Sequence, residues 1–206
     1  MTPTTNLVLL RHAEVEESYH RVFGGQIDMN LSARGHEQAE MLAAYFMGKS
    51  FDAIYASPMK RVAQTLKPLL AQPGRAAVVM NGLKEVNFGD WTGLNFEQVR
   101  EKFNVTAFEW LHQLELAAIP NAETVKTFRA RVEPCVEQIL RDHPGQTVAI
   151  ACHGGTIRMI LSILLDMPLP RFASFDIDYA SATWIRVSPP KTEVQLLNFT
   201  PWRDGA

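Results

Sequence analysis

The stretch Leu7-Val8-Leu9-Leu10-Arg11-His12 decides the fold, because four apolar residues run directly into an arginine and a histidine. A short apolar run of this kind predicts a β-strand that is buried on both faces, as in a parallel sheet. Two later stretches share this design. Phe51–Ala56 runs into Ser57-Pro58-Met59-Lys60-Arg61, and Thr147–Cys152 runs into His153-Gly154-Gly155. The sequence therefore predicts three buried strands with polar residues or glycines at their carboxyl ends.

Amphipathic stretches between these strands predict helices. Ser32 is an expected N-cap of a helix that reaches about Met47, and Ser57-Pro58 supplies the expected N-cap and first residue of a second helix. Two further helices are expected over Val125–Leu140 and from about Gly155 to Leu165. The remaining expected elements are a mainly helical stretch at Phe96–Leu116 and strands at Ala76–Met80, Ala182–Val187 and Val194–Phe199.

Strands that alternate with helices are typical of an α/β fold. We predict a three-layer α/β/α sandwich with a mainly parallel central sheet. A turn at Ser188-Pro189-Pro190 between the last two strands predicts an antiparallel pair at one edge. The 206 residues suit one domain over 1–206.

The net charge and the composition indicate which classes of binding partner the protein is expected to lack. The net charge of −2 gives no global basic field, so we expect neither nucleic acid nor a membrane surface as a partner. The longest apolar run, Met159–Leu165, is too short to span a membrane. Two cysteines and the lack of a signal-peptide pattern favour a cytoplasmic protein with reduced thiols. A homodimer is left open.

The three strand ends are expected to meet at one site, because ligands of α/β sheets bind beyond the carboxyl ends of the strands. Arg11, Arg61, His12 and His153 would then share a crevice. Arginine binds phosphate oxygens through two hydrogen bonds, histidine can be a nucleophile near neutral pH, and Gly154 allows the backbone to approach a ligand closely. Each feature alone is more typical of a structural role, so the hypothesis of a phosphoryl site depends on their joint placement.

The same residues carry a family resemblance. Leu9-Leu10-Arg11-His12-Ala13-Glu14 resembles the signature of the histidine phosphatase superfamily, which includes the cofactor-dependent phosphoglycerate mutases. The resemblance covers nearly the whole chain. Its further positions are Gly25, Asp28, Leu31, Ser32, Gly35, Ala56-Ser57-Pro58, Arg61, Gln64-Thr65, Leu83, Glu85, Phe88-Gly89, Trp91, Gly93, Pro120, Glu123, His153-Gly154-Gly155 and Ile157-Arg158.

The resemblance implies a catalytic role for five residues. His12 would attack phosphorus and become phosphohistidine, while Arg11, Arg61 and His153 would hold the phosphoryl oxygens. Glu85 would protonate the leaving oxygen and then activate water. No metal and no cofactor is expected, because the arginines and an imidazole would supply the positive charge.

The resemblance leaves a choice between hydrolysis and mutase chemistry. Mutase relatives usually carry asparagine where Gly155 stands, a Trp-Asn pair where Glu17-Ser18 stands, and a longer insertion than the stretch 94–120. We therefore predict a metal-independent phosphomonoesterase for a small phosphorylated metabolite, either α-ribazole phosphatase-like or of broad specificity. The alternatives are a phosphoglycerate mutase and a non-catalytic relative that binds phospho-ligands, which would be expected to lack one of the five residues. A metal-dependent hydrolase is disfavoured, because no His-Glu-x-x-His motif occurs.

The substrate itself is left open among sugar phosphates, nucleotide-derived phosphates and phosphoglycerates. The stretch 94–120, which contains Trp110 and His112, is expected to form a helical lid, although a packing helix explains its residues equally well. Gln26 and Trp91 are expected at the rim of the site. The expected substrate-binding residues are Ser18, Arg21, Phe23, Gly24, Gly154 and Tyr179.

Overall fold

The fold is built on a six-stranded mixed sheet with strand order β3-β2-β4-β1-β5-β6. The computed structural model describes residues 3–205, so the ends of the expected 1–206 domain lie outside the described residues. The strands β3, β2, β4 and β1 are parallel, whereas β5 and β6 form an antiparallel hairpin at one edge, as predicted. Their bounds are β1 Thr5–Arg11, β2 Ala53–Ala56, β3 Ala77–Val79, β4 Thr147–Cys152, β5 Ala182–Ser188 and β6 Lys191–Phe199.

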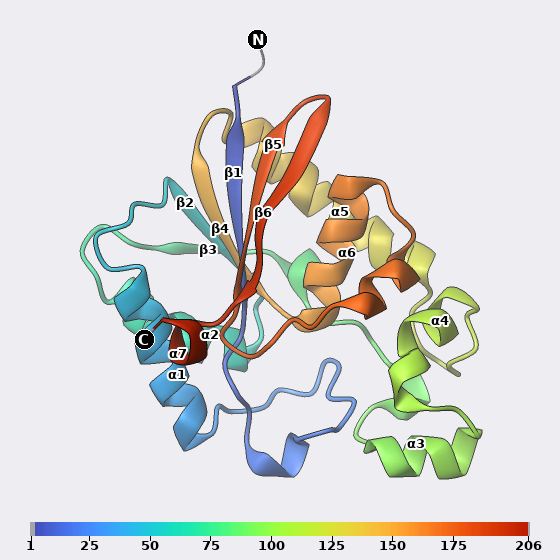
Figure 1. Ribbon diagram of the computed structural model, residues 1–206. Helices are drawn as coiled ribbons and strands as arrows, with labels where there is room; N and C mark the ends of the chain where they lie inside the picture. The colour runs from blue at the N-terminus through green and yellow to red at the C-terminus, as the bar shows by residue number, and fades with distance from the viewer. Residues whose placement is uncertain (1–2, 206) are drawn as a thin grey trace.

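Helices cover both faces of this sheet (Figure 1). Alternate residues of β1 point to opposite faces, so Val8 and Leu10 pack with the apolar side chains of α1 and α2, while Leu7 and Leu9 pack with those of α5 and α6. The predicted three-layer α/β/α sandwich is therefore confirmed. The helices are α1 Ala33–Tyr45, α2 Lys60–Leu70, α3 Phe96–Phe103, α4 Trp110–Glu115, α5 Val125–Asp142, α6 Gly154–Leu165 and α7 Pro201–Asp204.

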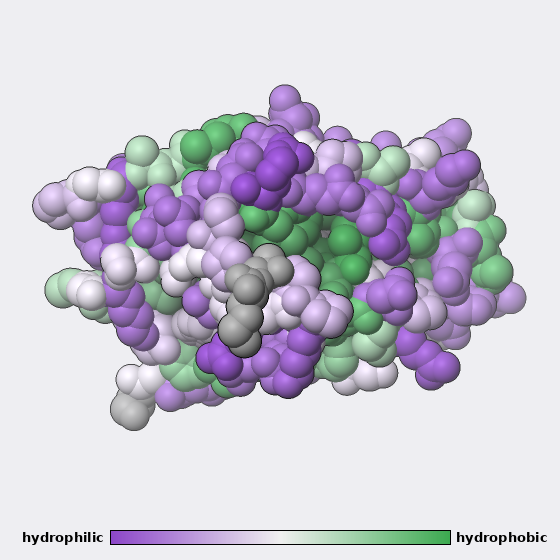
Figure 2. Space-filling model, turned by 90° about the horizontal axis from the view of Figure 1, so that it is seen from above, coloured by the Kyte–Doolittle hydropathy of each residue, from purple (hydrophilic) through white to green (hydrophobic). Residues whose placement is uncertain are grey.

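The register of the sheet brings the three chemically marked strand ends together. Arg11 pairs with Cys152 between β1 and β4, and Ala56 pairs with Ala151 between β2 and β4. The residues that follow these pairs, His12, Ser57 and His153, consequently leave the sheet side by side. Figure 2 shows the opposite, amino-end face, where hydrophilic residues lie around a hollow with hydrophobic side chains.

One local prediction was wrong. Ser57-Pro58 does not begin α2, which starts at Lys60 after an extended Met59, because the Ser57 hydroxyl lies 2.8 Å from the Nε2 atom of His153 instead of capping the helix. The stretch Phe96–Leu116 is mainly helical, as predicted, and Asn104, in a left-handed conformation with φ of 53°, ends α3 within it. A short 3-10 turn and then α4 follow.

The predicted cap of α1 is confirmed, since the Gly35 amide donates to the Ser32 hydroxyl at 2.9 Å. Within residues 3–205, none of the helices has the length and apolar character needed to cross a bilayer.

The buried position of β1 predicts a large effect of truncation there. Leu10→Ala should lower the free energy of unfolding by about 2–5 kcal/mol, because it opens a cavity between the sheet and the α1–α2 layer. Urea denaturation measures this change. Leu196→Ala on the edge strand β6, where Leu196 is 43% exposed, is the control and should cost less than about 1 kcal/mol. Equal losses in the two variants would contradict the assigned core.

Candidate active site

His12 follows β1 and is buried. Its Nδ1 atom lies 2.8 Å from the Ala13 carbonyl oxygen, which can only accept, so Nδ1 holds the ring proton. The Nε2 atom accepts a hydrogen bond from Arg61 Nε at 3.2 Å and therefore carries the lone pair. Burial, assisted by the charges of Arg61 and Arg11, holds the pKa of His12 well below its usual value. The imidazole is thus neutral at physiological pH, as a nucleophile requires.

His153 follows β4 and lies next to His12, with ring centroids 5.2 Å apart. Its Nδ1 atom accepts from the same Arg61 Nε at 3.2 Å, and its Nε2 atom lies 2.8 Å from the Ser57 hydroxyl. Burial and the charge of Arg61 keep its pKa well below the usual value. Ser57 therefore orients the second histidine. The sequence could have revealed this role, because Ser57 follows β2 as His12 follows β1.

Arg61 holds the two imidazoles in place. Its Nη1 and Nη2 atoms donate to the carbonyl oxygens of Ile27 and Gly25, each at 2.8 Å, so the guanidinium is anchored to the loop while Nε faces the histidines. Burial lowers its pKa to about 10, which still leaves the side chain charged at neutral pH. The site therefore contains a fixed positive charge behind its nucleophile.

Arg11 provides the clearest sign that the site can bind an anion. Its Nη1 atom donates to the Ile177 carbonyl, and its guanidinium lies over the Tyr179 ring, 4.1 Å from the centroid. Its Nε atom is buried and has no hydrogen-bond partner among residues 3–205. A buried N–H group without a partner costs free energy, which a bound anion would offset. Gly154 lies beside this atom, where a Cβ would be 3.5 Å from Nε.

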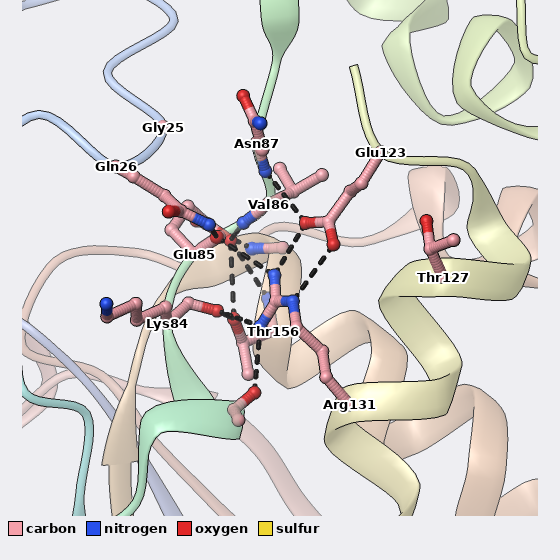
Figure 3. Close-up of polar contacts among 12 residues, drawn as sticks. Gly25, Gln26, Lys84, Glu85, Val86, Asn87, Glu123, Thr127, Arg131 and Thr156 are labelled. Carbon is pink, nitrogen blue, oxygen red and sulfur yellow. Dashed lines mark hydrogen bonds and ion pairs between the residues drawn. The ribbon is translucent and has the colours of Figure 1, made fainter. Parts of the chain in front are cut away.

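Glu85 reaches the amino end of α6. Its carboxylate accepts hydrogen bonds from the amides of Gly155 at 3.1 Å and Thr156 at 3.2 Å. A Cβ at Gly155 would lie only 2.5 Å from Glu85 Oε1, so glycine at this position makes room for the carboxylate. Figure 3 shows Glu85 above Thr156 in this arrangement.

These groups line a cavity of about 350 Å³ at the carboxyl ends of β1 and β4. Four of the five expected catalytic residues reach it, and His153 lies behind His12 without lining it. Arg158 also lines the cavity, although no role was assigned to it from the sequence. Its guanidinium donates to the carbonyls of Phe172, Gly154 and Phe175, and burial lowers its pKa to about 10. Its position one helical turn after Gly154 was the available signal.

The expected substrate-binding residues divide into two groups. Phe23, Gly24, Gly154 and Tyr179 line the cavity. Ser18 and Arg21 do not, because Ser18 is exposed on a 3-10 turn and Arg21 points to the surface, where it forms an ion pair with Glu97 at 3.5 Å.

The expected rim residues need correction too. Trp91 is 1% exposed and belongs to the core instead of the rim. Gln26 lies outside the cavity, and its amide donates to the Glu85 carbonyl at 3.1 Å. In the expected lid, Trp110 lines the cavity and His112 does not.

A neutral imidazole beside buried arginines, with a carboxylate across the cavity, defines the class of phosphoryl-transfer enzymes that use a histidine nucleophile. No group of three His, Cys, Asp or Glu side chains in the described part of the chain is placed to hold a metal ion.

Comparison with known proteins identifies the family. The sequence profile of the histidine phosphatase superfamily (branch 1) matches residues 7–200, so the chain belongs to this superfamily. Phosphoserine phosphatase 1 of Hydrogenobacter thermophilus is 29% identical over 94% of this chain and 92% of its own. A 2,3-bisphosphoglycerate-dependent phosphoglycerate mutase of Bartonella tribocorum is 32% identical over 77% of this chain and 80% of its own. The α-ribazole phosphatase structure from Shigella flexneri shares the fold, with a TM-score of 0.82, 24% identity and 95% and 96% coverage.

The two buried histidines predict a pH-dependent stability. The unfolded chain protonates them below about pH 6.5 while the folded chain keeps them neutral, so the free energy of unfolding should fall as the pH drops, by up to about 2.7 kcal/mol per pH unit. Urea denaturation between pH 7.5 and about 5 measures this slope. The double variant His12→Asn, His153→Asn should lose most of it, and an unchanged slope would contradict the neutral state of the pair.

Proposed function

We propose that this protein hydrolyses a small phosphomonoester through a phosphohistidine formed on His12. The observation that carries the proposal is the pairing of a neutral His12, whose Nε2 atom bears the lone pair, with the buried Arg11 Nε that has no partner among the described residues. A phosphoryl group placed there would meet a nucleophile and an unused donor together.

The proposed reaction has two steps. In the first, His12 Nε2 bonds to phosphorus as the bond from phosphorus to the ester oxygen breaks, and protonated Glu85 gives its proton to the departing alcohol. In the second, the Glu85 carboxylate takes a proton from water, the water oxygen bonds to phosphorus, and the bond to His12 breaks. Arg11 and Arg61 would stabilise the charge on the phosphoryl oxygens in both steps, and His153, which lies behind His12, would hold Arg61 in position. No metal or cofactor takes part.

The charges along the cavity favour water over a second phosphorylated substrate. Among the described lining residues, the cations are Arg11, Arg61 and Arg158, all near the expected phosphoryl position, and the other charged lining groups are carboxylates, including Asp176. A bisphosphorylated ligand would need positive charge at the far end as well. A mutase is therefore the second candidate, supported by the relative of that name. A non-catalytic role is disfavoured, since all five expected residues are present at one site.

We also propose that the stretch 94–120 acts as a lid over a bound ester. The stretch 94–120 contributes Phe96, Ala107, Phe108, Trp110 and Leu111 to the cavity, which supports a role in covering a bound ester.

His12→Ala should abolish both phosphate release and formation of a phosphoenzyme, because His153, the neighbouring imidazole, does not line the cavity. The wild-type enzyme, quenched during turnover of a ³²P-labelled ester, should carry an acid-labile, base-stable label on His12. A chelator should leave the wild-type rate unchanged. A label on another residue, or loss of activity with the chelator, would overturn the mechanism.

A further inference from the structure

Five aromatic side chains form a continuous wall along the cavity, in the order Trp110, Phe88, Phe23, Phe96 and Phe108. Successive ring centroids lie 5.3, 4.9, 5.5 and 5.9 Å apart. All five line the cavity, and we call them the aromatic wall. Phe23 and Phe88 are buried, whereas Phe108 is 80% exposed at the outer end. Apolar surface gathered in a cavity in this way is typical of a ligand site.

The aromatic wall begins at the group that would protonate the substrate. The Cη2 atom of Trp110 would lie 3.3 Å from a Cβ on Gly155. The Gly155 amide in turn donates to the Glu85 carboxylate. The ester oxygen must lie near Glu85 in the proposed reaction, so the alcohol attached to that oxygen extends along the wall. The rings therefore contact the leaving group instead of the phosphoryl group.

The charges around the leaving group disfavour a second anion there. The three arginines that line the described cavity already donate to backbone carbonyls or face the histidines. Asp176 and Asp178, the acidic groups besides Glu85 among the described lining residues, flank Ile177, whose carbonyl accepts from Arg11, and Asp178 is paired with Arg203 at 2.8 Å. A carboxylate on the leaving group would meet the rings, and among the described lining residues no cation lies beyond the three arginines at the phosphoryl position. Arg21, whose guanidinium lies over the Phe96 ring 5.5 Å from its centroid, does not line the cavity and is paired with Glu97.

We propose that the preferred substrate is a phosphomonoester whose alcohol carries a flat aromatic group and no negative charge, seated on the aromatic wall. This inference rests on the proposed phosphatase function and names the substrate class for that site.

The test compares 2-phenylethyl phosphate with ethyl phosphate, because their alcohols are of similar acidity and differ mainly in the ring. The kcat/KM value should be at least about tenfold higher for the phenyl ester, as expected when an apolar group enters a matching pocket. In Phe108→Ala this ratio should fall several-fold. Leu116→Ala is the matched control, because Leu116 is 60% exposed just after α4 and does not line the cavity. The ratio should be unchanged in this control.

The outcomes distinguish failure of the aromatic substrate class from failure of the proposed phosphatase function. Turnover of both esters at similar kcat/KM, or faster turnover of 3-phosphoglycerate than of the phenyl ester, would overturn the aromatic substrate class and leave the phosphatase function standing. No phosphate release from any of the three esters would overturn the proposed function, and the substrate class with it.

The segment that carries Glu85 is held in place by an arginine of α5. Arg131 of α5 donates from Nη1 to the carbonyls of Gly82 at 2.8 Å and Lys84 at 2.7 Å, and from Nη2 to the Glu85 carbonyl at 3.0 Å (Figure 3). One guanidinium thus binds three carbonyls of the segment that leads to the proposed acid. Residues 84–88 lie outside the helices and strands, so these bonds replace the support that regular structure would give.

Glu123 fixes both Arg131 and the far side of the same segment. Its two carboxylate oxygens bind Arg131 Nη2 at 2.6 Å and Nε at 2.9 Å, and one of them also accepts from the Asn87 amide at 2.7 Å. The pair is mostly shielded from solvent, with side-chain exposures of 23% and 12%. A bidentate, charge-assisted pair of this kind is geometrically specific.

The geometry assigns Arg131 and Glu123 as positioning residues that hold Glu85 against the amino end of α6. Neither residue lines the cavity, and the bonds of Arg131 and Glu123 to the segment of Glu85 make Glu85 their main route to the reaction. Their loss should therefore slow esters whose leaving group needs a proton and spare an ester whose leaving group departs as a stable anion.

Arg131→Gln should lower kcat/KM for ethyl phosphate by about 10²-fold or more, the usual contribution of general acid catalysis, and lower it much less for 4-nitrophenyl phosphate. Arg131→Lys should recover part of the loss. Arg129→Gln is the matched control on the same helix, because Arg129 pairs with Glu133 at 2.9 Å, away from the segment. It should change neither value.

Glu123→Gln keeps the shape of the side chain and serves as the milder variant if Arg131→Gln does not fold. It should show the same dependence on the leaving group. Equal losses for the two esters in Glu123→Gln, or no loss for either, would overturn the positioning role.

Discussion

The site depends on one buried arginine whose Nε atom is shared by two imidazoles. Arg61 donates to His12 Nε2 and His153 Nδ1, each at 3.2 Å, while its other nitrogens bind the carbonyls of Gly25 and Ile27. A buried charge is tolerated only when its donors are satisfied, and here the acceptors come from a loop and two strand ends. The arginine therefore connects three distant parts of the chain, and its charge adds to burial in keeping both histidines neutral.

The sheet makes this arrangement possible. Parallel pairing of β1, β2 and β4 places three strand ends at one edge, and α6 starts at the same edge with amide groups that bind the Glu85 carboxylate. The phosphoryl end of the cavity consequently contains rigid backbone and buried cations. The stretch between Leu94 and Pro120 contributes Phe96, Phe108 and Trp110 to the aromatic wall, and Phe23 and Phe88 complete it from other segments. The rings proposed to contact the leaving group thus come from three segments of the chain, one of which also carries Glu85.

Much of this could be predicted from the sequence, because the strong signals were local. Apolar runs ending in Arg11-His12 and His153-Gly154 predicted both the strands and their meeting point. Two of the failures have one cause: a side chain forms a tertiary contact that no local pattern contains. Ser57 binds a histidine 96 residues away instead of capping a helix, and Arg21 pairs with Glu97 at the surface. The three hydrogen bonds from Arg131 to backbone carbonyls could not be predicted from the sequence either.

The hydrogen bond between Arg61 and His12 has a consequence for the order of events. The lone pair of His12 Nε2 that would attack phosphorus is the one that accepts the hydrogen bond from Arg61 Nε. The nitrogen must surrender this bond as it becomes bonded to phosphorus, and an incoming phosphoryl oxygen can take its place as the acceptor. Before substrate binds, His12 Nε2 thus occupies the acceptor position that a phosphoryl oxygen would take. Arg61 Nε–H then changes its acceptor from the imidazole to that oxygen as the reaction begins.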